Sequence, residues 1–119
     1  MEIEAKKIFD KEKMLKRLGN KEALCKKLIA LTPKHFSEQV EKLKTSLKEN
    51  DAESARLCAH TIKGMMSNAG APRLYEIACE MQDAGGEGDL DNVRSLLGSL
   101  EQQFDLFQSV LYECGWLET

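Results

Sequence analysis

The chain has 119 residues, of which 42% are apolar and 31% are charged, and its formal net charge is −3. This length suits a single domain with one core. The acidic balance argues against a nucleic-acid-binding module, which is normally basic. The sequence contains no apolar run of about 18 residues and no signal-peptide core at its N-terminus. We therefore expect a cytoplasmic protein without a membrane span.

Four cysteines are spread along the chain, and no two of them lie within twenty residues of each other. This spacing excludes a metal knuckle and a C-x-x-C redox pair. Each cysteine falls in a helix-like stretch or at its end. We expect reduced, partly buried side chains with a structural role.

The first half of the chain predicts two helical segments. The motif Phe9-Asp10 precedes a short apolar repeat, which predicts a short helix ending at Gly19-Asn20. A second helical stretch begins near Ala23 and continues to about Glu49. Thr32-Pro33 falls inside this stretch. A threonine cap followed by a proline at the first helical position would restart or kink the helix there.

The second half predicts three more helices. Asn50-Asp51 is a turn and cap signal before a helix from about Ala52 to Asn68, and Gly70 can terminate that helix. The next helix begins near Ala71-Pro72.

The clearest loop in the sequence is the glycine-rich stretch 85–88. Asp89 can cap a last helix, whose apolar stripe ends near Leu111. We expect a loose tail from Gly115 onward, with Trp116 as the residue able to pack back on the other helices. Long helices joined by short loops favour an antiparallel up-down four-helix bundle with a short extra N-terminal helix. The chain is thus expected to be one all-α domain, 1–119, with its core at about 9–111.

The helix over residues 52–68 carries the strongest functional candidate. At about 100° per residue, its apolar stripe centres on Ile62, and His60 lies about 160° away on the solvent side. Lys63 at i+3 and Gly64 at i+4 neighbour His60 on the helix surface. The rest of the stripe consists mostly of small residues: Ala55, Cys58, Ala59, Met66 and Ala69.

Gly64 is an unusual residue in the middle of a helix. Glycine in an exposed helix interior costs about 0.5–1 kcal/mol relative to alanine. One explanation is that bare space is needed beside His60, so that another protein can reach the ring. Close packing against a neighbouring helix would explain the glycine equally well, and helix geometry alone leaves both explanations open.

The run over residues 59–71, AHTIKGMMSNAGA, resembles the signature of histidine phosphotransfer domains. That pattern is a histidine, a lysine three residues on, a glycine directly after it, and a second glycine six residues beyond. His60, Lys63, Gly64 and Gly70 match it. The resemblance extends from about residue 9 to residue 111 and includes Phe9-Asp10, Arg17-Leu18-Gly19-Asn20 and Gly88-Asp89.

This resemblance implies a phosphocarrier in a two-component phosphorelay. The histidine of such domains takes a phosphoryl group from the aspartate of a response-regulator receiver domain and passes it to another receiver. His60 would be the acceptor through Nε2, Lys63 would steady the phosphoryl oxygens, and Gly64 would keep the ring accessible. The expected partners are receiver domains and a hybrid sensor histidine kinase, and we expect the carrier to be a monomer. It would need no cofactor of its own, because Mg²⁺ belongs to the receiver.

Two further residues follow from the resemblance. In members of the family, a glutamine on the next helix hydrogen-bonds the second ring nitrogen, and Gln82 falls at the matching distance from His60. An ordinary boundary glutamine is the alternative interpretation. Met65 departs from the small residues that the family often has after this glycine. It sits at the edge of the apolar stripe, where it could alter the contact with a receiver.

Other functions have less support. The sequence has no phosphate-binding loop and no kinase glycine box, so we expect no autophosphorylation from ATP, and whether the carrier counts as an enzyme stays open. A di-metal bundle needs Glu-x-x-His pairs, but Thr32 and Leu57 precede His35 and His60. A helical adaptor of the same fold that only binds receiver or kinase domains is the remaining alternative. The sequence does not decide between a free-standing carrier, a module of a larger sensor kinase and the chemotaxis-kinase variant.

Overall fold

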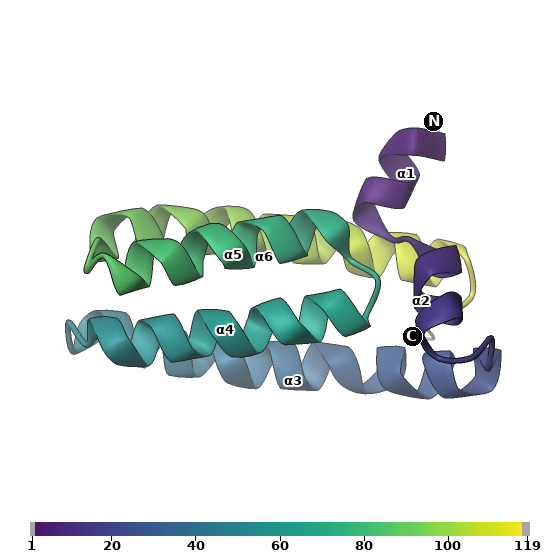
Figure 1. Cartoon of the computed structure of the whole chain (residues 1–119), viewed down its shortest axis with the longest axis horizontal. Coiled ribbons are helices and arrows are strands. Elements are labelled where there is room, and N and C mark those ends of the chain that lie inside the picture. Colours follow the sequence, from purple (N-terminus) through teal and green to yellow (C-terminus); the bar gives the residue numbers. More distant parts are fainter. Residues whose placement is uncertain (1, 118–119) are drawn as a thin grey trace.

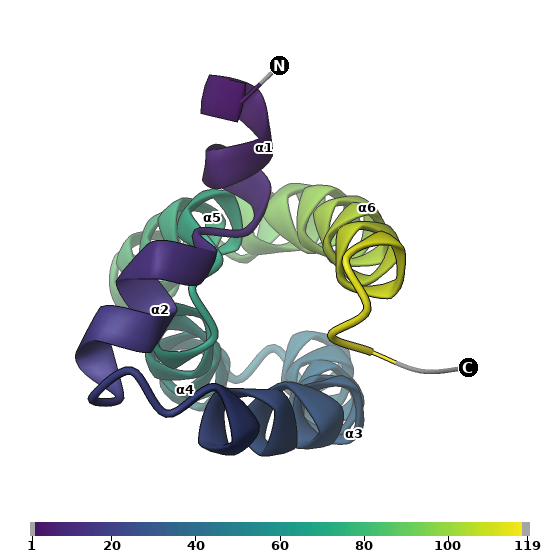
Figure 2. The ribbon, with the colours of Figure 1, turned by 90° about the vertical axis from the view of Figure 1, so that its right-hand side faces the viewer.

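A computed structural model describes residues 2–117, with side chains from residue 4 onward, and within this range it contains six α-helices and no strand. The helices are α1 (Glu2–Ile8), α2 (Lys11–Arg17), α3 (Glu22–Lys48), α4 (Ala52–Asn68), α5 (Pro72–Gly86) and α6 (Leu90–Glu113). The all-α prediction is confirmed. Figure 1 shows α3 to α6 lying along the long axis, and Figure 2 shows them end-on around a common centre.

The four long helices bury one apolar core between them. The core runs in sequence from Phe9 to Trp116, and its largest fully buried side chain is Phe107 of α6. The stripe predicted for α4 is buried as expected, with Ile62 and Met66 fully enclosed. No helix in the described range is long and apolar enough to cross a membrane.

Helix α3 continues through Pro33 without a restart. The restart predicted at Thr32-Pro33 was therefore wrong, whereas the kink given as its alternative stays a prediction. The apolar face does not change at the proline, because Ile29, Phe36 and Val40 are buried on both sides of it. Tertiary packing on that single face outweighs the local helix-breaking preference of proline.

The turns around α4 have the chemistry that the sequence predicts. The Asp51 carboxylate accepts a hydrogen bond from the backbone N–H of Ser54 at 3.1 Å, which caps the first turn. Asn50 precedes it with a φ of +54°, and Gly70 follows the helix with a φ of +66°. The bounds of α4 match the predicted Ala52–Asn68.

Helix α5 extends into the glycine-rich stretch 85–88, which was predicted to be a loop. Gly85 and Gly86 belong to its last turn, and only residues 87–89 separate it from α6. Gly85 serves close helix packing instead of a loop, since a Cβ there would lie 3.1 Å from backbone atoms of Arg56 on α4. Glycine at this position allows α5 and α4 to approach closely.

Two short helices, rather than the predicted one, precede the bundle. Helix α2 corresponds to the predicted short helix, and α1 comes before it. Figure 2 shows both at one end of the bundle, with α2 close to α4 and α1 extending away. Trp116 packs back as predicted, because its ring is buried against Phe9 at a centroid distance of 5.4 Å. The prediction of a loose tail was wrong for residues 115–117, since the backbone N–H groups of Trp116 and Leu117 both donate to the Leu111 carbonyl. Residues 118–119 of the predicted tail lie outside the described residues.

Candidate functional site

His60 lies at the middle of α4 with its side chain exposed to solvent. The buried stripe of the helix faces the core, so His60 points away from it, as the helical wheel predicts. Among the described residues, no side-chain hydrogen bond involves the His60 imidazole. The imidazole therefore has no partner among the described side chains.

Gly64 lies one turn beyond His60, and a Cβ at this position would meet nothing within 4 Å. The close-packing explanation for this glycine is therefore wrong. Gly85 and Gly70 show the contrast, because a Cβ at either would press against a neighbouring segment. Gly64 leaves an open surface beside the histidine.

Lys63 supplies positive charge next to His60. Its side chain is half-buried, and it forms no ion pair with any carboxylate of the described residues. Arg56, one turn before His60, is engaged elsewhere, since it donates to Glu53 at 2.6 and 3.0 Å. That hydrogen bond lowers the pKa of the Glu53 carboxyl below its ordinary value. Lys63 is thus the cation left available beside the ring.

Gln82 is half-buried on α5. The contact between Gly85 and Arg56 sets the register of the antiparallel pair α4 and α5. Because Gln82 precedes Gly85 by three residues, it lies about one turn along α4 from Arg56, close to the level of His60. No hydrogen bond joins Gln82 to His60 in the described part of the chain.

Apolar side chains surround the exposed face of α4. Leu57, one turn before His60, is 50% exposed. On the other side of Gly64, the half-buried Met65 lines a groove of about 310 Å³ between α2, α3 and α4. Leu28 and Leu31 of α3 form the opposite wall, and Leu31 is 51% exposed. An apolar surface of this kind is typical of a protein-interaction site.

Arg17 of α2 ties the N-terminal end of the chain to the end of α4. Its Nη1 donates to Ser67 Oγ at 2.8 Å and to Asn68 Oδ1 at 3.3 Å. Arg17 lies beside the apolar groove and also beside a second hollow of about 360 Å³ that reaches Tyr75 on α5. Helix α2 is therefore part of the surroundings of the site.

Sequence reasoning missed this apolar surface and the role of Arg17. A signal for the former was present, because Leu24, Leu28 and Leu31 recur at i, i+4 and i+7 beside the buried stripe of the same helix. Such a second stripe on one helix indicates an apolar face in addition to the core face. The Arg17 contacts join residues 50 and 51 positions apart, and no local pattern predicts them.

The described residues contain no group of three or more His, Cys, Asp or Glu side chains placed to hold a metal ion. All four cysteines are free thiols, and Cys25 and Cys58 are buried in the core.

A profile of the Hpt domain family matches residues 28–109 of this chain. The chain belongs to the Hpt domain family. Hpt domains work with receiver domains and kinases in two-component systems. The match includes α4, so the exposed His60 lies inside the Hpt region.

The fold of this Hpt domain is similar to a solved crystal structure, that of histidine-containing phosphotransfer protein B (HptB) from Pseudomonas aeruginosa PAO1. The TM-score is 0.81, and the similarity covers 88% of this chain and 91% of that one. At 23% identity, the likeness concerns the fold. No curated protein matches this chain.

Proposed function

We propose that this Hpt domain accepts a phosphoryl group on Nε2 of His60 from a receiver-domain aspartate and passes it to a second receiver. The observation that carries the proposal is the exposed His60 beside the open surface at Gly64. A hybrid sensor histidine kinase would supply the first receiver. One copy of the chain suffices, because the proposed site residues all belong to α4 and α5.

In the proposed transfer, the Nε2 lone pair attacks phosphorus and forms an N–P bond. The P–O bond to the aspartate breaks, and the carboxylate leaves with the bonding electron pair. This requires a neutral imidazole whose proton is on Nδ1. Transfer of this kind depends mainly on positioning and charge stabilisation. The receiver contributes its acidic pocket and Mg²⁺, and this chain contributes the nucleophile.

Lys63 and Gly64 would shape the surroundings of the ring. The Lys63 ammonium has no carboxylate partner in the described structure, so it is available to the phosphoryl oxygens. Gly64 keeps the approach open for the bulk of a receiver. The apolar side chains of Leu57, Leu31 and Met65 would then be covered by the docked receiver.

Gln82 would orient the ring from α5 by accepting a hydrogen bond from Nδ1–H. Its half-buried place near the level of His60 supports this role. We expect the Gln82→Ala variant to show a changed tautomer balance in the ¹⁵N NMR spectrum of His60 and slower transfer. A variant with the same spectrum and the same rate would remove Gln82 from the site.

The decisive experiment uses His60. The protein is incubated with a phosphorylated receiver from the same organism, and acid-labile phosphate on the Hpt chain is measured. We expect labelling of the wild type and none of His60→Gln. Labelling of the variant would refute His60 as the acceptor. If neither protein is labelled but both bind the receiver, the adaptor alternative is favoured.

A further inference from the structure

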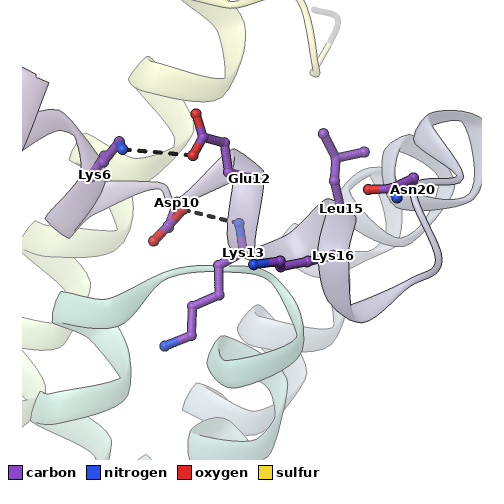
Figure 3. Close-up of a pocket in the computed structure, with 7 residues that line it drawn as sticks. All are labelled: Lys6, Asp10, Glu12, Lys13, Leu15, Lys16 and Asn20. Carbon is purple, nitrogen blue, oxygen red and sulfur yellow. Dashed lines mark hydrogen bonds and ion pairs between the residues drawn. The ribbon is translucent and has the colours of Figure 1, made fainter.

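Helix α2 presents a basic face at the end of the bundle where α4 ends. It carries four cations and one carboxylate, and that carboxylate, Glu12, lies 3.7 Å from Lys6 in an ion pair. Lys13, Lys16 and Arg17 are exposed and form no ion pair with the described carboxylates. Figure 3 shows Lys13 and Lys16 together on one side of α2. Their charge is therefore open to a partner.

This basic face is held rigidly against α4. Arg17 donates to Ser67 and Asn68, and the backbone N–H of Asp10 donates to the Gly70 carbonyl at 2.7 Å. Lys13 also borders the hollow that Ser67 and Gly70 line. Helix α2 is a fixed part of the surface at the C-terminal end of α4.

The end of α4 that contacts α2 lies within the reach of a partner docked on His60. Ser67 is seven residues beyond His60, which is about 10 Å along a helix that rises 1.5 Å per residue. A stable protein interface covers about 800 Å² on each partner, equivalent to a disc of about 16 Å radius. Because transfer requires the receiver aspartate to reach His60, a footprint centred there reaches the end of α4 that Arg17 of α2 contacts.

The charge of the molecule is unevenly divided between the two parts of the sequence. Residues 1–48 contain 13 cations and 7 carboxylates, whereas residues 49–119 contain 4 cations and 13 carboxylates. Helix α5, beside α4, has one arginine and three carboxylates, and the carboxylate residues Glu76, Glu80 and Asp83 are exposed. The candidate site therefore lies beside the cations of α2 and the carboxylates of α5, and the two sets meet at the hollow that Lys13 and Glu76 both line.

We propose that the basic face of α2, formed by Lys13 and Lys16, binds the acidic rim of the receiver's phosphorylation pocket. The inference rests on the proposed function. A receiver gathers carboxylates around its divalent ion, and its phosphorylated aspartate adds negative charge. Attraction to α2 and repulsion from α5 turn the acidic rim toward α2 during the encounter. Electrostatic attraction of this kind raises the association rate and selects the orientation.

The test measures the association rate of a fluorescently labelled, phosphorylated receiver by stopped flow, and phosphate transfer is measured on the same samples. The variants are Lys13→Glu and Lys16→Glu. We expect each to slow association about three- to tenfold at low salt, with the difference disappearing near 0.5 M salt because charges are then screened. We expect the rate of phosphate transfer within the bound complex to be the same in the variants and the wild type.

Lys48→Glu is the matched control, because Lys48 is an exposed cation in the last turn of α3 without an ion pair in the described structure. Lys48→Glu changes the net charge by the same amount as Lys13→Glu but at the opposite end of the bundle. We therefore expect a much smaller decrease in the association rate. Glu12→Gln is a second variant that should accelerate association, because it removes the only carboxylate of α2.

Equal association rates for the Lys13→Glu, Lys48→Glu and wild-type proteins at low salt would overturn the α2 proposal. The proposed function would survive that result if His60 still gains phosphate. A different result would separate the two proposals in the other direction. If His60 gains no phosphate but Lys13 and Lys16 still control receiver binding in a salt-dependent way, the proposed phosphotransfer function is overturned and docking on α2 is supported. If these lysines control binding to a duplex DNA oligonucleotide and not to the receiver, the assignment of the partner is wrong.

Discussion

The backbones of Asp10 and Gly70 are in direct contact. The Asp10 N–H donates to the Gly70 carbonyl at 2.7 Å, and a Cβ at Gly70 would lie 2.8 Å from the Asp10 carbonyl oxygen. Two motifs that are 60 residues apart in the sequence, Phe9-Asp10 and the second glycine of the histidine signature, therefore form one structural unit. This contact fixes α2 to the end of α4.

Replacing Gly70 by alanine should destabilise the fold. The φ of +66° is strained for any residue with a Cβ, and strain of this kind costs about 1–3 kcal/mol. The clash with the Asp10 carbonyl adds to that cost, because a backbone atom cannot rotate away. We expect the free energy of unfolding of Gly70→Ala, measured by urea denaturation, to fall by more than the cost of the φ strain alone.

Gly88 is the control for this prediction. It has a φ of +75°, but a Cβ there would meet nothing within 4 Å. Gly88→Ala therefore carries the backbone strain without the clash. Equal losses of stability in the two variants would mean that the close approach of Asp10 to Gly70 has no energetic effect.

Gly64 should affect transfer without supporting the fold. Gly64→Ala is expected to stabilise the protein by about 0.5–1 kcal/mol, because alanine is a better helix former. The added methyl group lies on the surface that a receiver must approach, and small misplacements can cost up to about a hundredfold in rate. We expect slower transfer for Gly64→Ala and a larger loss for Gly64→Leu, measured by phosphate labelling of His60.

Gly98 of α6 offers a matched comparison. It is also an exposed glycine inside a helix where an added Cβ would meet nothing within 4 Å, and it lies on a different helix from His60. Gly98→Ala should raise stability by a similar amount and leave transfer unchanged. If Gly64→Leu transfers phosphate as fast as Gly98→Ala, the access role of Gly64 is refuted.

The sequence predicted elements whose signals are local. The bounds of α4 were correct because the Asp51 cap and Gly70 both act within one turn of the helix ends. The exposed position of His60 followed from helix periodicity. The helix restart predicted at Pro33 and the loop predicted at Gly85 were wrong because packing overrode local preference. Pro33 lies on the continuous apolar face of α3, and Gly85 packs against Arg56.

The surroundings of the candidate site depend on long-range contacts, which periodicity does not contain. The groove beside Met65 requires Leu28 and Leu31 from another helix. The place of α2 depends on the contact of Arg17 with Ser67. The sequence could therefore identify the residues of the signature, but not the surface that a partner would cover.

Arg17 provides a direct test of the contact between α2 and α4. Arg17→Ala removes the hydrogen bonds to Ser67 and Asn68, which should cost about 1 kcal/mol of stability because the pair is exposed. The loosened α2 should also raise the KM for the receiver while kcat stays nearly unchanged. Arg17→Lys keeps the charge and should recover only part of the lost affinity, because lysine cannot reproduce the fork of donors.

Arg94 is the matched arginine at the opposite end of the bundle. It donates to the Leu47 carbonyl at 3.0 Å and to Asn50 Oδ1 at 3.3 Å. Arg94→Ala should lose similar stability without a change in the KM for the receiver. A rise in KM of equal size in both variants would indicate a general effect of stability instead of a local effect of α2.

The four cysteines should react with iodoacetamide in an order set by their burial. Cys114 is exposed and Cys79 is half-buried, whereas Cys25 and Cys58 are enclosed in the core. Burial also raises the pKa of the Cys58 thiol, so less of the reactive thiolate is present at neutral pH. The pKa of the Cys58 thiol is higher in the folded protein than in the unfolded one, so the neutral thiol favours the folded state below the ordinary thiol pKa. This stabilisation is lost as the pH rises through the folded pKa. Mass spectrometry should therefore show labelling of Cys114 first and of Cys58 only upon unfolding, and early labelling of Cys58 would contradict the packing of α3 against α4.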